Sequence, residues 1–222
     1  MQKIIVVGGG KGGVGKSTVS MALLDALLQS EEQPIYVETD DSNPDVYKAV
    51  NDQVPSEICN LDNETGWIKL GNIIEAHPKD FILVNTAARL TDSLIEHGSI
   101  LIEVAKAVNM PVVMLWPLNR QRDGLELLKN FLDSGLECSA TYALLNTYFG
   151  KDDKFSRYHA SKLKGRVTNT IIFPELNDLV ADKIIDNRLA FWSAETKLSI
   201  AEKSALFKFR TAARAALGPV YE

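Results

Sequence analysis

A glycine-rich segment, GGGKGGVGKST at residues 8–18, constrains the fold of this chain more than any other feature. It follows the apolar run KIIVV and precedes STVSMALLDALLQS, in which apolar residues recur at helical spacing. Gly10, Gly15, Lys16 and Ser17 fit the pattern GxxxxGK[ST], which between a buried strand and a helix is typical of a phosphate-binding loop. We therefore expect backbone N–H groups of this loop to surround phosphate oxygens at the N-terminus of the helix.

Two side chains in the loop add chemistry that glycine lacks. Lys16 is expected to neutralise the β- and γ-phosphates of a nucleotide, and the Ser17 hydroxyl to ligate Mg²⁺. A turn made only for its shape would need neither side chain. The residues expected to hold the nucleotide here are Gly10, Lys11, Gly12, Gly13, Val14, Gly15, Lys16, Ser17 and Thr18.

The rest of the chain alternates strands and helices. Apolar runs predict strands at 34–40, 79–87, 110–118, 139–146 and 167–175, and helical spacing predicts helices at 92–108 and 123–135 and near the C-terminus. This alternation predicts an α/β fold, a doubly wound and mostly parallel sheet with helices on both faces. No linker interrupts residues 1–222, so we expect one nucleotide-binding domain. Ligands of such sheets bind at the carboxyl ends of the strands.

Composition narrows the class of protein. The formal net charge of -5 does not favour a protein coated in positive charge. Two cysteines, Cys59 and Cys138, are too few for a disulfide framework or a metal cluster and indicate reduced thiols. The first strand leaves no room for a signal peptide, and no apolar run reaches the roughly 18 residues of a membrane span. We expect a cytoplasmic bacterial protein.

Lys11 turns the loop into KGGVGKS, which closely resembles the deviant phosphate loop of the ParA/MinD ATPases, in the SIMIBI class of P-loop NTPases. That family includes plasmid-partition, division-site and arsenic-pump ATPases and the nitrogenase iron protein. The resemblance implies that Lys11 reaches across a face-to-face homodimer to the phosphates held by the partner subunit. ATP binding would then also hold the dimer together. The alternative is an exposed loop lysine without this role.

The segment VETDDSNPD resembles the acidic switch of the same family, with Glu38 and Asp40 in the places of a D-x-D motif. The resemblance implies that Asp40 orients or activates the attacking water and contacts the Mg²⁺ shell, work that needs a carboxylate. Lys11, Lys16 and Asp40 are thus the candidate catalytic residues. The alternative is an acidic turn, an interpretation that we keep for Asp41 and Asp45.

The strand that ends in ILVNTAAR departs from the family pattern. Asn85 replaces an aspartate that holds a magnesium-bound water, and Ala87 replaces a proline. An amide can bind such a water but adds no negative charge. We expect Mg²⁺ to be held by Ser17 and Asp40, with a weak water-mediated contact from Asn85, and ATP hydrolysis to be slow.

Two matches concern the nucleotide base. Asn146 follows a strand where the family keeps an asparagine or arginine beside adenine, and Pro174 with Glu175 resembles the stretch that closes the adenine pocket. Asparagine and proline after strands are otherwise turn residues. The segment NRQRD has Arg122 where a guanine-binding N-K-x-D motif needs aspartate. These features favour ATP over GTP.

Two segments bear on partners. Residues 151–166 carry Phe155 and Tyr158 among a group of basic residues, and they form either a DNA-backbone contact without sequence preference or a solvated rim. The basic residues are Lys151, Lys154, Arg157, Lys162, Lys164 and Arg166. The C-terminal helix is basic and amphipathic, but its apolar face of alanine and leucine favours packing on the sheet over a membrane anchor.

The short form of the chain and its divergent switches resemble the accessory ATPases of plasmid-stability and conjugative-transfer loci, the StbB, TraL and MobD type. The leading hypothesis is an ATPase that dimerises on ATP and, with a protein partner, positions plasmid DNA or a transfer complex. The alternatives are a nucleotide-binding scaffold without turnover, a membrane-associated positioning ATPase like MinD, and an ATP-dependent ligase like dethiobiotin synthetase. Fold alone does not choose among them.

Overall fold

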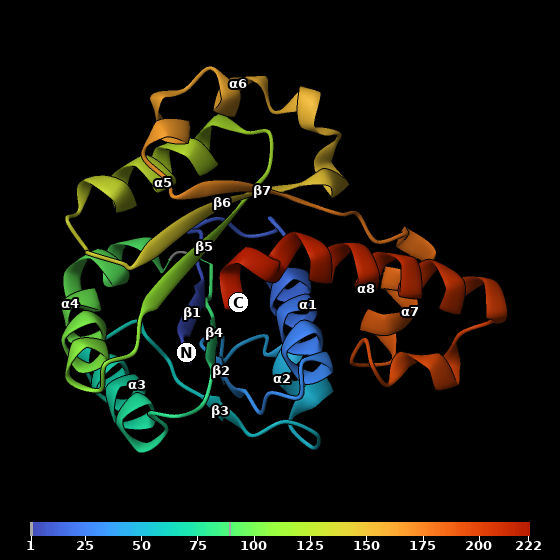
Figure 1. Ribbon diagram of the computed structural model, residues 1–222, viewed down its shortest axis with the longest axis horizontal. Helices are drawn as coiled ribbons and strands as arrows, with labels where there is room; N and C mark the ends of the chain where they lie inside the picture. Colours follow the sequence, from blue (N-terminus) through green and yellow to red (C-terminus); the bar gives the residue numbers. More distant parts are fainter. Residues whose placement is uncertain (1, 89) are drawn as a thin grey trace.

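The computed structural model describes residues 2–88 and 90–222. Its strands form one seven-stranded sheet in the order β3-β2-β4-β1-β5-β6-β7, in which every neighbouring pair is parallel (Figure 1). The strands are β1 (Ile4–Val7), β2 (Ile35–Glu38), β3 (Ser56–Ile58), β4 (Ile82–Asn85), β5 (Val112–Leu118), β6 (Ala140–Asn146) and β7 (Asn169–Phe173). The predicted parallel α/β fold is confirmed.

Helices cover both faces of the sheet (Figure 1). They are α1 (Lys16–Gln29), α2 (Asp45–Val50), α3 (Glu64–Ala76), α4 (Thr91–Ala107), α5 (Arg122–Asp133), α6 (Ser156–His159), α7 (Asp178–Asp186) and α8 (Ile200–Tyr221). Successive strand residues point to opposite faces, so Ile5 and Val7 pack under α1 and α8 while Ile4 and Val6 pack under α3 and α4. Two hydrophobic cores result, one on each face.

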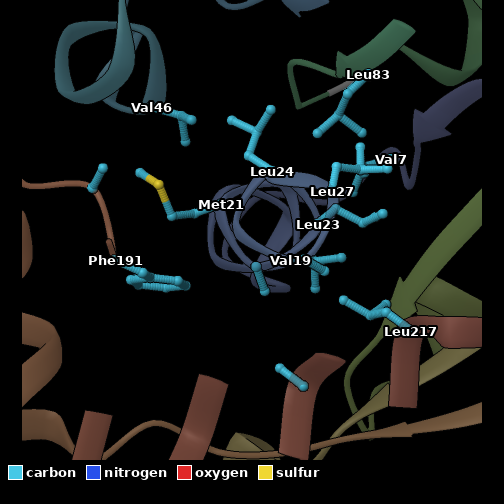
Figure 2. Close-up of a cluster of buried hydrophobic side chains, with 14 of the residues drawn as sticks. Val7, Val19, Met21, Leu23, Leu24, Leu27, Val46, Leu83, Phe191 and Leu217 are labelled. Carbon is cyan, nitrogen blue, oxygen red and sulfur yellow. The ribbon is translucent and has the colours of Figure 1, made fainter. Parts of the chain in front are cut away.

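Helix α1 is buried on nearly all sides. Its Val19, Leu23 and Leu27 pack between sheet residues and Leu217 of α8, as Figure 2 shows in a view along the helix. The helix begins at the glycine-rich loop, so this packing fixes where the loop lies. The position of the loop is therefore set by the packing of α1.

The C-terminal helix packs mainly on α1 and also on β7, whereas the sequence predicts a helix packed on the sheet. Ser199 forms a capping box with Glu202 at its start, and Leu206, Phe209 and Leu217 are buried. Arg210 forms a bidentate ion pair with Asp25 of α1, with N···O distances of 2.7 and 2.8 Å. No helix among the described residues is long and apolar enough to cross a membrane.

Residues 45–76 contain elements that the sequence analysis missed. They form α2, β3 and α3 between the second and third predicted strands. Strand β3 has three residues, SEI, at the edge of the sheet and none is fully buried. An edge strand this short carries no apolar run, which explains why the pattern did not reveal it.

The basic segment 151–166 folds into short helical turns between β6 and β7. Phe155 and Tyr158 are buried in the core on the α5 side of the sheet. Their rings are therefore not available to stack on bases, contrary to a nucleic-acid surface with exposed aromatic residues. Arg166 pairs with Asp133, and Lys154 with Asp153.

Candidate nucleotide-binding site

The glycine-rich loop takes backbone conformations that its glycines permit. Gly9, Gly13 and Gly15 have φ values of 110°, 72° and 94°, in the region that disfavours other residues. A Cβ on Gly15 would lie 2.3 Å from the Asn146 side chain, and one on Gly10 would lie 2.0 Å from the Thr91 hydroxyl. Conformation and close packing thus both require glycine in this loop.

Lys16 begins α1 and is 8% exposed. Its ammonium donates a hydrogen bond to the Lys11 carbonyl at 2.9 Å. Burial lowers the pKa of Lys16 to about 8, against the opposing effect of the Asp40 and Glu38 carboxylates. A buried cation at the start of a helix is well placed to receive an anionic ligand, which would also relieve the cost of its burial.

A cleft of about 230 Å³ opens where the loop meets the carboxyl ends of β2 and β4. It is lined by Gly12, Gly13, Gly15, Lys16, Ser17, Asp40, Asn43, Asn85, Thr86 and Ala88. The fold therefore brings the predicted phosphate loop, the Ser17 hydroxyl and the Asp40 carboxylate together. A hydroxyl and a carboxylate are oxygen ligands that suit Mg²⁺.

Asp40 lies at the start of a tight turn after β2. Its carboxylate accepts hydrogen bonds from the Ser42 hydroxyl at 2.6 Å and from the backbone N–H of Asn43 at 2.9 Å. The Ser42 hydrogen bond is the main reason that the pKa of Asp40 is lowered, with a smaller contribution from the Lys16 charge. Asp40 is thus an anion at the mouth of the cleft.

Asn85, which lines the cleft, forms a buried pair with Glu38 that the sequence did not reveal. Burial raises the pKa of Glu38, and hydrogen bonds from Tyr36 and Asn85 oppose that rise. The Asn85 amide lies 3.1 Å from both Glu38 oxygens. The register of β2 on β4 pairs these two positions.

Lys11 folds back onto its own chain. Its ammonium donates to the Gln121 side chain and forms an ion pair with Asp123 at 2.8 Å. Both partners lie at the start of α5. In this conformation the Lys11 side chain does not contribute to the cleft of its own subunit.

The three residues predicted to contact the base do not share one surface. Asn146 is buried and supports the loop, because its amide donates to the Val14 carbonyl at 3.0 Å. Pro174 and Glu175 line a groove of about 660 Å³ between the ends of β6 and β7 and α8. Leu176 lines a separate apolar cleft of about 240 Å³, together with Thr18, Met21 and Phe191.

Protein MobD of Acidithiobacillus ferrooxidans is 36% identical to this chain over 226 residues, which cover 100% of the chain and 99% of that protein. The chain belongs to the MobD family. No protein-family model matches it.

Within the described residues, no group of three or more histidine, cysteine, aspartate or glutamate side chains is placed to hold a metal ion.

Solved structures with this fold contain nucleotides. MinD of Pyrococcus horikoshii, complexed with Mg-ADP, has a TM-score of 0.58 and 18% identity, covering 99% of this chain and 96% of that one. A protein of Borrelia burgdorferi described as a plasmid partition protein, bound to AMPPNP, has a TM-score of 0.55 and 16% identity, covering 94% and 98%. The MobD-family chain therefore has the P-loop NTPase fold of MinD and ParA-like proteins.

Proposed function

We propose that this chain is a Mg²⁺-dependent ATP-binding switch that dimerises on ATP and hydrolyses it slowly. The observation that carries the proposal is the joint placement of Lys16, Ser17 and Asp40 around one cleft at the N-terminus of α1. The Mg-ADP in one structure of this fold and the AMPPNP in another support it.

Each of these side chains has a task in phosphoryl transfer. The Lys16 ammonium would leave the Lys11 carbonyl and neutralise the phosphates, and the loop N–H groups would bind their oxygens. The Ser17 hydroxyl and the Asp40 carboxylate fit a Mg²⁺ ion, which would neutralise charge that develops on the phosphates. Asp40 also orients the attacking water and accepts its proton.

Lys11 completes the site of a second subunit in this proposal. Its ammonium lies at the surface, on a loop that already borders the cleft, and an exposed ion pair such as Lys11–Asp123 is weak enough to exchange for a triphosphate. The homodimer is then stabilised by the nucleotide. We propose the base to lie near residues 174–176, of which Pro174 and Glu175 line the groove and Leu176 lines the apolar cleft.

The cargo that we propose is plasmid DNA or a conjugative-transfer complex, reached through a protein partner in the bacterial cytoplasm. The MobD relationship and the ParA-like fold support this direction. DNA contact through residues 151–166 has less support, because the aromatic residues of that segment are buried. A partner protein would therefore supply the contact with DNA.

Binding of a fluorescent ATP analogue and light scattering with and without Mg²⁺ test this function. Wild type should bind the analogue and double its mass with ATP. Lys16→Ala should lose binding, whereas Lys11→Ala should bind ATP and stay monomeric. Lys129→Ala is the matched control, because Lys129 is an exposed lysine of α5 paired with Asp133. Normal dimerisation of Lys11→Ala would refute the cross-subunit role.

A scaffold without turnover is the second candidate. The occupied Asn85 amide favours it, because Ser20 and Glu38 already bind its oxygen and nitrogen. Release of phosphate in a single turnover separates the two candidates. ATP binding and dimerisation without any phosphate release would establish the scaffold.

A further inference from the structure

The facing ends of β2 and β4 carry a hydrogen-bonded network under the nucleotide cleft. Glu38 and Asn85 are register partners on these strands, and they are 1% and 4% exposed. A buried carboxylate is costly unless donors surround it. The partners of Glu38 therefore define what it does.

The Asn85 amide has one orientation that satisfies its neighbours. An ionised carboxylate only accepts hydrogen bonds, so Nδ2 of Asn85 must face Glu38, 3.1 Å from each oxygen. Oδ1 then faces α1 and accepts from the Ser20 hydroxyl at 2.9 Å. Asn85 thereby links the helix that starts with Lys16 to the end of β2.

Glu38 connects Asn85 to the backbone of Thr39 and Asp40. Its Oε1 accepts from the backbone N–H groups of Thr39 at 3.1 Å and Asp40 at 3.2 Å, and its Oε2 accepts from the Tyr36 hydroxyl at 2.6 Å. These donors and Asn85 use the acceptor capacity of the carboxylate. Glu38 therefore fixes the backbone from which Asp40 projects into the cleft.

We propose that Asn85 is a positioning residue whose amide holds Glu38 as the buried anion that places Asp40 opposite Lys16 and Ser17. This role rests on the proposed Mg²⁺–ATP site, and it differs from the water-mediated metal contact expected from the sequence. In this pair the negative charge belongs to β2 and the hydrogen-bond donor to β4. A carboxylate at position 85 could not donate, and it would face Glu38 at about 3 Å.

Exchange of the two groups tests this arrangement. Asn85→Asp opposes two carboxylates, and we expect its melting temperature without nucleotide to fall by about 5–10 °C. Glu38→Gln should also lose stability, but less, because its one amide oxygen can still accept from the Thr39 and Asp40 N–H groups. The Asn85 amide and the Ser20 and Tyr36 hydroxyls would have to exchange their donor and acceptor roles around the introduced amide nitrogen. Each single variant should bind Mg²⁺–ATP at least roughly tenfold more weakly.

The double variant Glu38→Gln/Asn85→Asp should recover both properties. The amide oxygen introduced at position 38 would accept from the Thr39 and Asp40 N–H groups, and the amide nitrogen would donate to the carboxylate introduced at position 85. Ser20 would still donate to position 85. Asn130→Asp, at an exposed position of α5, is the matched control for adding one negative charge, and we expect it to behave as wild type.

Two results would overturn the proposal. One is an Asn85→Asp variant that melts like wild type and binds Mg²⁺–ATP more tightly, because position 85 would then face the metal. The other is a double variant no more stable than the weaker single variant. If wild-type protein failed to bind Mg²⁺–ATP, the proposed function would be wrong, but the melting temperatures would still test the network.

Discussion

The ammonium of Lys11 lies 2.8 Å from the Asp123 carboxylate of the same chain. This ion pair, together with the Gln121 side chain, holds Lys11 at the start of α5. The Lys11 hydrogen bond lowers the pKa of Asp123. In the proposed dimer, Lys11 would have to leave these acceptors before it could serve the partner subunit, so the ion pair would oppose dimerisation.

Asp123→Asn should therefore favour the dimer. The ATP concentration that gives half-maximal dimerisation should fall by about two- to fivefold, because an exposed ion pair contributes little. Light scattering over an ATP titration measures this. Asp133→Asn, which removes the partner of Lys129 on the same helix, is the control. If Asp123→Asn needed more ATP than wild type, Asp123 would contribute to the dimer instead of restraining Lys11.

Affinity for ATP should fall as pH rises above 8. Lys16 has a pKa of about 8 in the nucleotide-free protein, so at pH 9 most molecules carry it neutral. If only the charged form binds, the Kd at pH 9 should exceed that at pH 7 by roughly tenfold. Lys16→Arg is the comparison, because arginine stays protonated over this range. An equal pH dependence in both proteins would show that another group is responsible.

The same pKa predicts that the free energy of unfolding rises with pH, whereas the affinity for ATP falls. The ordinary lysine value of 10.5 applies to the unfolded chain, which therefore binds more protons than the folded chain between about pH 8 and 10.5. Raising the pH through this window relieves the burial of charge, so this group adds stability there. Below pH 8 both states are charged and its contribution is constant. Urea unfolding of wild type and Lys16→Met at pH 7.5 and 9.5 measures the difference.

Sequence patterns predicted most of the fold because buried parallel strands are continuous apolar runs. The run at 110–118 is an example, since it contains β5, which is buried along its whole length. The edge strand β3 gives no such signal. The glycine motif likewise predicted that Lys16 and Ser17 lie together at the start of a helix, because this motif has a fixed spacing along the chain.

Relations between distant residues were not predictable in the same way. Asn85 was expected to face a metal-bound water, and that contact stays a prediction, but the structure places its amide on Glu38, 47 residues away. Which face of a strand end carries the amide depends on register, and register is not readable from one strand. The Lys11–Asp123 ion pair depends in the same way on how the loop meets α5.

Gly15→Ala should remove nucleotide binding, and Asn146 explains part of the effect. An alanine there would have a disfavoured φ of 94° and a Cβ 2.3 Å from the Asn146 side chain. Gly13→Ala is the matched comparison, because φ is 72° and no atom lies near its added Cβ. We expect Gly13→Ala to lower the free energy of unfolding by about 1–2 kcal/mol through backbone strain alone. Gly15→Ala should lower it by more. Equal losses of stability and of ATP affinity would show that packing against Asn146 is unimportant.

The ion pair between Asp25 and Arg210 predicts how firmly the C-terminal helix is held on α1. Asp25 is 2% exposed, and Arg210 binds both of its oxygens from α8. Arg210→Met would leave the carboxylate buried without its counter-charge, so the free energy of unfolding should fall by about 3 kcal/mol. The double variant Asp25→Leu/Arg210→Met replaces the ion pair by apolar groups. Its free energy of unfolding should fall much less than that of Arg210→Met. Arg214→Met is the control on the same helix, because the side-chain hydrogen bonds of Arg214 among the described residues are long ones, at 3.4 Å, to Gln29 and Ser30. Urea unfolding monitored by circular dichroism measures all three. If Arg210→Met had the same free energy of unfolding as Arg214→Met, the ion pair would not stabilise the packing of α8 on α1. The apolar face of α8 alone would then hold the helix in place.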